Sequence, residues 1–167
     1  MRAFNLLLCC ALLGAVWSSE AADVLATKAD GWHTWQVGES GASSEMCCYS
    51  WDSGKRTRGS CNLDGRNMSF SNDGDCSAAP GTLQVYAQIR NGQPESIHVL
   101  SSNCSVATKT SIVNHGTVTS EENMSWFRGV IEDPSMDQDT REMALFALVL
   151  SESDAAYDYI DRLLSKN

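Results

Sequence analysis

The sequence predicts an α+β protein in which a small, disulfide-stabilised antiparallel β domain precedes a short α-helical region. Two observations predict this class. Residues 23–118 are rich in glycine, serine, asparagine and threonine, alternate apolar with polar side chains, and contain five cysteines. Residues 119–167 contain no cysteine and place apolar side chains at helical intervals. We therefore expect two units, divided near residue 118.

The first 22 residues predict a secretory signal peptide. One arginine precedes an apolar run at 6–17, and small residues follow the run. The run is shorter than the ~18 residues that a membrane-spanning helix needs, and no later segment comes closer. Cys9 and Cys10 lie inside it, and we expect them to be removed with it. The prediction is a periplasmic or secreted protein that has no membrane anchor after processing.

Two segments predict the strands of the β domain. GWHTWQVG (31–38) alternates His33, Trp35 and Val37 with polar residues and Trp32 on the other face. LQVYAQIR (83–90) alternates more clearly, and Asn91-Gly92 then offers the positive φ angles of a hairpin turn. The apolar face resumes at 97–99, so we expect an antiparallel hairpin with Pro94 in its loop.

Three helices are expected after the β domain. Thr119 stands three residues before Glu122, the spacing of a capping box, and Pro134 breaks the first helix. Asp139 is predicted to cap a second helix whose eight consecutive apolar residues at 143–150 require cover on more than one side. We expect the third helix to form an antiparallel hairpin with the second. Its predicted buried stripe is Ala156, Tyr159, Ile160, Leu163 and Leu164.

The five cysteines after residue 22 predict disulfides. Exported chains meet an oxidising environment, and a small strand-rich domain gains stability from covalent loop closure. A structural zinc site usually shows a close pair such as C-x-x-C twice, whereas here Cys47 and Cys48 are adjacent and the other cysteines lie far apart, so we expect no metal. Five is odd: we predict two bonds among Cys47, Cys48, Cys61 and Cys104, and an unpaired Cys76. Geometry disfavours a bond between the adjacent Cys47 and Cys48, and the sequence does not choose among three pairings.

The candidate catalytic motifs of the sequence are weak. The histidines that could serve a thiol enzyme are His33, His98 and His115. None has a spacing that ties it to a cysteine. GESGA (38–42) resembles a serine-hydrolase elbow, but no helical pattern follows Ser40. Asp73 and Asp75 have the spacing that opens a calcium loop, without the closing glutamate. We expect no enzyme activity, no catalytic residue and no cofactor.

The charge distribution excludes nucleic acid as a partner. The chain carries a net charge of -9, and the eleven acids and four bases of residues 121–167 supply -7 of it. Phosphate binding needs a concentrated positive surface. The one basic cluster, Lys55, Arg56 and Arg58, is interpreted as a solvated loop.

Aromatic residues and sequons add two smaller expectations. We expect the tryptophans to pack in the core, although Trp32 and Trp35 could instead offer an exposed aromatic contact to a partner. The other two tryptophans after residue 22 are Trp51 and Trp126. Three N-x-S sequons are treated as chance. They begin at Asn67, Asn103 and Asn123.

A resemblance adds to these predictions. The segment DPSMDQDTREMALFALVLSESDAAYDYIDRLL (133–164) resembles one HEAT-type helical repeat of the kind found in exported bacterial proteins. The matching positions are Arg141, Ala144, Leu145, Ala147, Leu148, Ala156, Ile160 and Leu163. The β domain is similar to the leader domain of such proteins, with a tryptophan-rich strand, an MCC cluster (46–48), a C-x-L (61–63) and an S-x-x-C (101–104). HEAT arrays normally stack ~3 or more repeats, whereas this chain has one. It is therefore either a shortened member whose helices pack on the β domain or a truncated gene product.

The sequence thus predicts a non-catalytic, exported protein-binding or scaffold module. The resemblance implies protein binding and brings no catalytic residue. The acidic helical surface and exposed aromatics are expected to contact a protein partner, so charge reversal at Glu121, Glu122, Asp154 and Asp158 should abolish binding. Two alternatives stay open: a thiol-dependent enzyme or redox protein using Cys76, and a structural remnant of a longer repeat protein.

Overall fold

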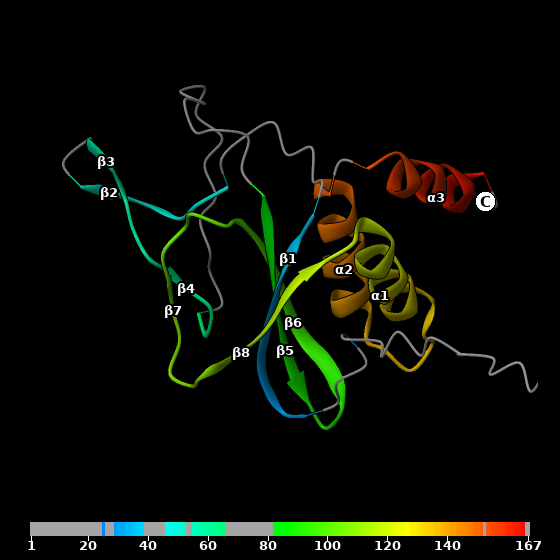
Figure 1. Cartoon of the computed structure of the whole chain (residues 1–167), viewed down its shortest axis with the longest axis horizontal. Helices are drawn as coiled ribbons and strands as arrows, with labels where there is room; N and C mark the ends of the chain where they lie inside the picture. The colour runs from blue at the N-terminus through cyan, green and yellow to red at the C-terminus, as the bar shows by residue number, and fades with distance from the viewer. Residues whose placement is uncertain are drawn as a thin grey trace, which may run out of the picture.

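A four-stranded sheet with helices on one face forms the centre of the protein (Figure 1). The computed structural model describes residue 25 and residues 29–38, 46–52, 55–65, 82–151 and 153–165. The predictions for residues 1–22, Ser40, Asn67, Asp73, Asp75 and Cys76 lie outside these residues. The α+β class predicted from the sequence is confirmed.

The main sheet has the strand order β6-β5-β1-β8. β1 (Gly31–Val37) and β5 (Leu83–Arg90) pair antiparallel, and β5 pairs antiparallel with β6 (Gln93–Ser101). β8 (Ile112–Val118) runs parallel to β1, so the sheet is mixed and not antiparallel throughout as expected. Two-stranded pairs lie outside it: β2 (Tyr49–Asp52) with β3 (Lys55–Arg58), and β4 (Cys61–Asn62) with β7 (Val106–Ala107).

Two details of the strands were predicted wrongly. Pro94 lies within β6 and not in the hairpin loop. It pairs with Ile89 next to a register shift, and β6 is an edge strand, so the missing N–H costs little there. The basic residues 55–58 form β3, which pairs with β2, and are not a loop. The predicted turn is confirmed: Asn91 has φ 53° and Gly92 φ 75°, as a two-residue hairpin turn requires.

Three helices follow β8: α1 (Ser120–Glu132), α2 (Gln138–Leu150) and α3 (Asp154–Leu164). The capping box of Thr119 and Glu122 is present, and α1 ends two residues before Pro134. The N-cap of α2 is Asp137 and not Asp139. Asp137 accepts hydrogen bonds from the backbone N–H and the hydroxyl of buried Thr140, both at 2.8 Å, which fixes the start of the helix two residues earlier.

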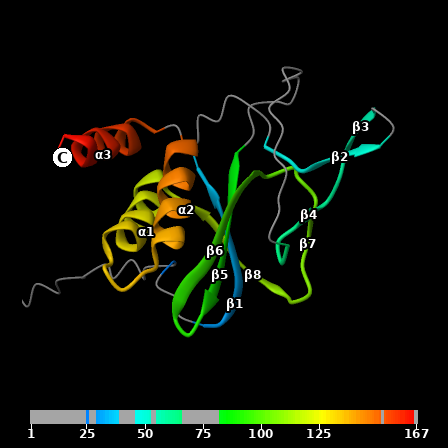
Figure 2. The same cartoon turned by 180° about the vertical axis from the view of Figure 1, so that it is seen from behind.

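The main core lies between the helices and one face of the sheet, and α1 and α2 cover this face side by side (Figure 2). Alternate residues of the strands, such as Trp35, Val85 and Val99, meet Phe127 of α1 and Leu148 of α2 there. The strands and helices therefore share one hydrophobic core. The division into two domains near residue 118 stays a prediction, although strand gives way to helix at Thr119.

The packing of α3 differs from the sequence prediction. α2 packs against both β6 and α1, so it is covered on more than one side as predicted, although Phe146 and Val149 of its apolar run stay exposed. α3 leaves the end of α2 and points away from the sheet, so the two do not form an antiparallel hairpin (Figure 1). Of the five residues predicted to be buried in α3, only Ala156 and Tyr159 are buried. Leu164 is 71% exposed because no element of the described chain covers the far end of α3.

Candidate functional site

Two disulfides join the four cysteines that the sequence predicted to be bonded. Cys47 bonds to Cys104, 57 residues away, and Cys48 bonds to Cys61, 13 residues away. All four are buried in a second hydrophobic cluster, which also contains Trp32, Leu63, Tyr86 and Leu100. Internal disulfides of this kind are typical of proteins that fold in an oxidising, extracytoplasmic compartment. A sulfur in a disulfide is not a free thiolate, so these cysteines offer no nucleophile in this form.

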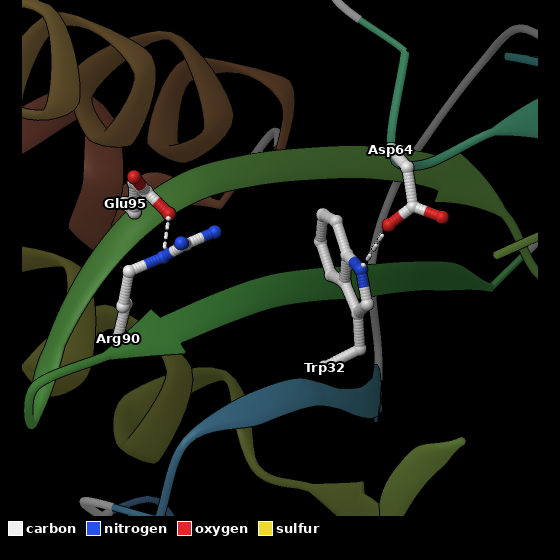
Figure 3. A network of polar contacts seen from close by, with 4 residues as sticks. All are labelled: Trp32, Asp64, Arg90 and Glu95. Carbon is white, nitrogen blue, oxygen red and sulfur yellow. Dashed lines mark hydrogen bonds and ion pairs between the residues drawn. The ribbon is translucent and has the colours of Figure 1, made fainter. Parts of the chain in front are cut away.

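Asp64 connects the disulfide cluster to the main sheet (Figure 3). Its carboxylate accepts hydrogen bonds from the Trp32 indole N–H at 3.0 Å, the Lys109 backbone N–H at 2.6 Å and the Thr108 hydroxyl at 3.3 Å. These bonds, that of Trp32 first, hold the pKa of Asp64 below its usual range. Asp64 lies two residues after the end of β4, so it fixes the end of the cysteine segment against β1.

Trp32 and Trp35 serve the core and not an exposed contact, and the side chain of Trp51 lies outside the described part of the chain. Trp32 is fully buried and stacks against His98, with ring centroids 5.6 Å apart. Trp35 is buried on the opposite face, where its indole N–H donates to Asn123 at 2.9 Å and its ring meets Trp126 edge-on. The alternative of Trp32 and Trp35 as a partner-binding pair is therefore wrong. Asn123 is buried as well, so its sequon cannot carry a glycan in the folded protein.

His33 and His115 lie together, which the sequence analysis did not foresee. The His33 Nδ1 and His115 Nε2 atoms are 2.9 Å apart, and His33 Nε2 lies 2.8 Å from the Ala29 carbonyl oxygen. Because a carbonyl only accepts, His33 Nε2 donates, and a neutral His33 accepts from His115 through Nδ1. The centroids are 5.2 Å apart and the planes differ by 21°, so the rings meet tip to tip and nearly in one plane.

This geometry favours a structural role for the histidine pair. His33 is buried on β1, and His115 lies on the neighbouring strand β8, so the bond ties the edge strand to the sheet. A proton on each ring nitrogen would set two N–H groups against each other and break the bond. Only residues distant in sequence meet here, and no spacing rule could have paired them.

We expect the protein to lose stability as the pH falls from about 7.5 to about 5. Burial lowers the pKa of His98 from its ordinary 6.5. The pKa of His115 is lowered mainly by burial and to a smaller extent by the nearby His33. As the pH falls below 6.5, these histidines take up protons in the unfolded chain before they do so in the folded protein. The free energy of unfolding therefore decreases until the pH lies below the folded-state pKa values. Thermal melts followed by circular dichroism across this range measure the effect.

The control for this prediction is the double variant His98→Gln/His115→Gln, which should show a flatter dependence of Tm on pH. The carboxylates with lowered pKa values, such as Asp64 and Asp137, lose their contribution only at more acidic pH, so they do not obscure this window. A Tm that rises on acidification, or the same slope in the variant and the original protein, contradicts the assignment.

Large apolar side chains are exposed mainly on the last two helices. Phe146 is 60% and Val149 39% exposed on α2, and Tyr157 is 50% and Leu164 71% exposed on α3. Among the described residues the one other exposed large apolar side chain is Val113 of β8. The eight-residue apolar run of α2 thus supplies both a buried and an exposed side.

Acidic side chains share the faces on which these apolar residues lie. Residues three or four apart are neighbours on a helix surface. On α2 the exposed residues at this spacing are Asp139, Glu142, Phe146 and Val149, which we call the α2 stripe. On α3 they are Asp154, Tyr157, Asp161 and Leu164, which we call the α3 stripe. Each stripe combines two carboxylates with two apolar side chains.

A polar group on α1 holds α3 in its position. The Tyr159 hydroxyl lies 3.1 Å from Glu132 Oε1, and the Arg128 guanidinium lies over the Tyr159 ring, 5.4 Å from its centroid. Burial, followed by the bond to Glu132, raises the pKa of the Tyr159 hydroxyl, so it stays protonated and donates. With Tyr159 turned toward α1, the α3 stripe faces away from the core.

One of the four acids that the sequence selected for binding, Glu122, has a structural role. Glu122 accepts from both the backbone N–H and the hydroxyl of Thr119, each at 2.8 Å, so reversing its charge would also break the cap of α1. Glu121 is exposed on the same first turn. Asp154 belongs to the α3 stripe, and Asp158 is exposed beside it.

The described part of the chain holds no group of three or more histidine, cysteine, aspartate or glutamate side chains placed to bind a metal ion. Within the same residues, none of the helices has the length and apolar character needed to cross a bilayer. Comparison with known protein families, with curated protein sequences and with solved structures finds no match to this chain.

Proposed function

We propose that this is an exported, non-catalytic module that binds another protein through the exposed faces of α2 and α3, in the manner of a short HEAT-type repeat. The observation that carries the proposal is the presence of four large exposed apolar side chains on two consecutive helices, Phe146, Val149, Tyr157 and Leu164. Apolar surface that gathers in one region, bordered by polar residues, is characteristic of protein interaction sites.

The arrangement of the helices supports the same proposal. A HEAT repeat buries its faces by stacking on neighbouring repeats. Here α1 and α2 pack on the sheet, and the outer sides of α2 and α3 have no cover from the described residues. A partner protein would take the place of the next repeat. The two disulfides support a periplasmic or secreted location, in which such a module would act.

The test is the recovery of a partner from the exported fraction. We expect tagged protein, crosslinked in its native compartment with free thiols blocked, to retain a stoichiometric companion. The variant Phe146→Ser should lower the recovery of that companion roughly tenfold, because an exposed aromatic anchor contributes much of the binding energy of an interface. Quantitative mass spectrometry of the crosslinked complex measures the ratio.

The matched control is Val113→Ser, which removes an apolar side chain that is similarly exposed but lies on β8. It should leave the recovery unchanged. Equal recovery with Phe146→Ser and with the original protein would refute this surface as the binding site. Circular dichroism should show that both variants keep the native fold, since exposed substitutions usually change stability by about 0.5 kcal/mol or less.

A further inference from the structure

The α2 stripe and the α3 stripe carry apolar and acidic side chains in a regular order. Each stripe extends over ten residue steps, 139–149 and 154–164, which is roughly 15 Å along a helix. Apolar anchors and carboxylates thus recur within about three turns on each helix. The order differs, since the acids precede the apolar residues along α2 and alternate with them along α3. A helical ligand of the α2 stripe must present basic and apolar groups at intervals that match its acids and apolar residues.

We propose that the partner of this surface is a cationic amphipathic helix, meaning a protein segment that presents apolar and arginine or lysine side chains on one face. This inference rests on the proposed function and names the chemistry of its partner. The described residues of 119–165 contain ten acids and three bases, so the helical region is strongly negative. A positively charged ligand is attracted to such a surface, and a negatively charged one is repelled.

Charge also decides against the other occupants of an exposed apolar face. A second copy of this chain would bring one acidic stripe against another, and like charges brought together across an interface cost several kcal/mol. Membrane surfaces are negatively charged, and helices that lie on them carry lysine and arginine beside their apolar face, whereas here Glu142 and Asp161 occupy those positions.

The shape of the surface favours a helix over an extended peptide. Extended peptides bind by adding a strand to a sheet edge, where backbone groups pair. The exposed stripes lie on helices, whose backbone groups are already bonded within the helix, and side-chain ridges of one helix pack into the grooves of another. A partner helix would pack on the outer side of α2, opposite the residues that α2 buries in the core.

The order of residues in the α2 stripe assigns a direction to the partner. Asp139 and Glu142 lie in the N-terminal half of α2, and Phe146 and Val149 lie in its C-terminal half. Basic side chains are favourable in the last turn of a helix, where the helix dipole is negative. An antiparallel partner therefore places its apolar residues first, against Phe146, and its basic residues last, against Glu142.

The probe for this proposal is a synthetic helical peptide of about 15 residues, labelled with a fluorophore. It carries two leucines one turn apart, followed by two arginines one turn apart on the same face. The control peptides have the same composition in reversed order, or glutamate in place of arginine. Fluorescence anisotropy with the full oxidised protein measures binding, and the far-ultraviolet circular dichroism of the complex reports helix formation.

We expect saturable binding of the arginine peptide that weakens as salt is raised from about 50 to about 500 mM. Glu142→Arg and Phe146→Ser should each weaken binding roughly tenfold or more. The matched variants Asp30→Arg and Val113→Ser carry the same kinds of change at exposed residues outside the helical region and should bind within about twofold of the original protein.

Several outcomes overturn the proposal. Equal binding of the glutamate peptide, or equal loss with Asp30→Arg and Glu142→Arg, would show that the stripes do not select a basic partner. Stronger binding of the reversed peptide would overturn the antiparallel direction. If the arginine peptide does not bind while Phe146→Ser still lowers the recovery of the crosslinked companion, the proposed function stands and the partner is not a cationic helix. If neither depends on Phe146, both fail.

Discussion

Replacing Trp35 with alanine is expected to lower the free energy of unfolding by about 3–5 kcal/mol, the largest effect of any single truncation in the main core. Trp35 is 1% exposed and packs against Trp126 with ring centroids 4.9 Å apart. Its indole N–H also donates to Asn123, which is buried on α1. The substitution opens a cavity between sheet and helix and removes a buried hydrogen bond at once. Urea unfolding followed by circular dichroism measures the loss.

Two further variants separate the cavity from the hydrogen bond. Trp35→Phe keeps most of the packing but leaves the Asn123 side-chain oxygen without its donor, which should cost about 1–3 kcal/mol. Adding Asn123→Leu to Trp35→Phe removes the unpaired oxygen and should recover part of that loss. If Trp35→Phe leaves the free energy of unfolding unchanged, or if the double variant is less stable than Trp35→Phe, the assigned role of this bond is contradicted.

The elements that could be predicted from the sequence are those decided by neighbouring residues. Strand alternation in 83–90, the positive φ angles of Asn91 and Gly92, and the capping box at Thr119 each depend on interactions within a few residues. Local steric and hydrogen-bonding rules apply directly to such segments. The N-cap of α2 is also a local feature, although it was predicted wrongly. Asp137 and Asp139 could each cap the helix, and the hydrogen bonds from buried Thr140 select Asp137.

The features that could not be predicted depend on contacts between distant residues. The parallel placement of β8 beside β1 brings His115 to His33, 82 positions apart, and no local pattern encodes that pairing. The disulfide connectivity left three options for the same reason. The exposed side of α2 could not be located from the sequence, because an apolar run indicates only that cover is favourable and tertiary packing decides which of its residues are covered. Phe146, on which the proposed site rests, is one of the residues left exposed.

Removing the disulfide between Cys47 and Cys104 is expected to destabilise the protein by about 4 kcal/mol, and removing that between Cys48 and Cys61 by about 3 kcal/mol. The difference follows from the loops that the bonds close, 57 and 13 residues long, because a longer loop loses more entropy in the unfolded chain when it is closed. Both cysteines of a pair must be replaced by serine, since a single partner left behind could exchange with the other disulfide.

Urea unfolding of the two double variants under oxidising conditions gives the comparison, with the fully reduced original protein as the limiting control. The buried surroundings of the bonds add a second expectation. Both lie in the cluster around Trp32 and Leu100, so loss of either should also loosen the contact between Asp64 and the Trp32 indole, visible as a change in tryptophan fluorescence before global unfolding. Equal losses in the two variants, or a greater loss for the 13-residue loop, would mean that folded-state packing and not the unfolded chain sets the contribution of these bonds.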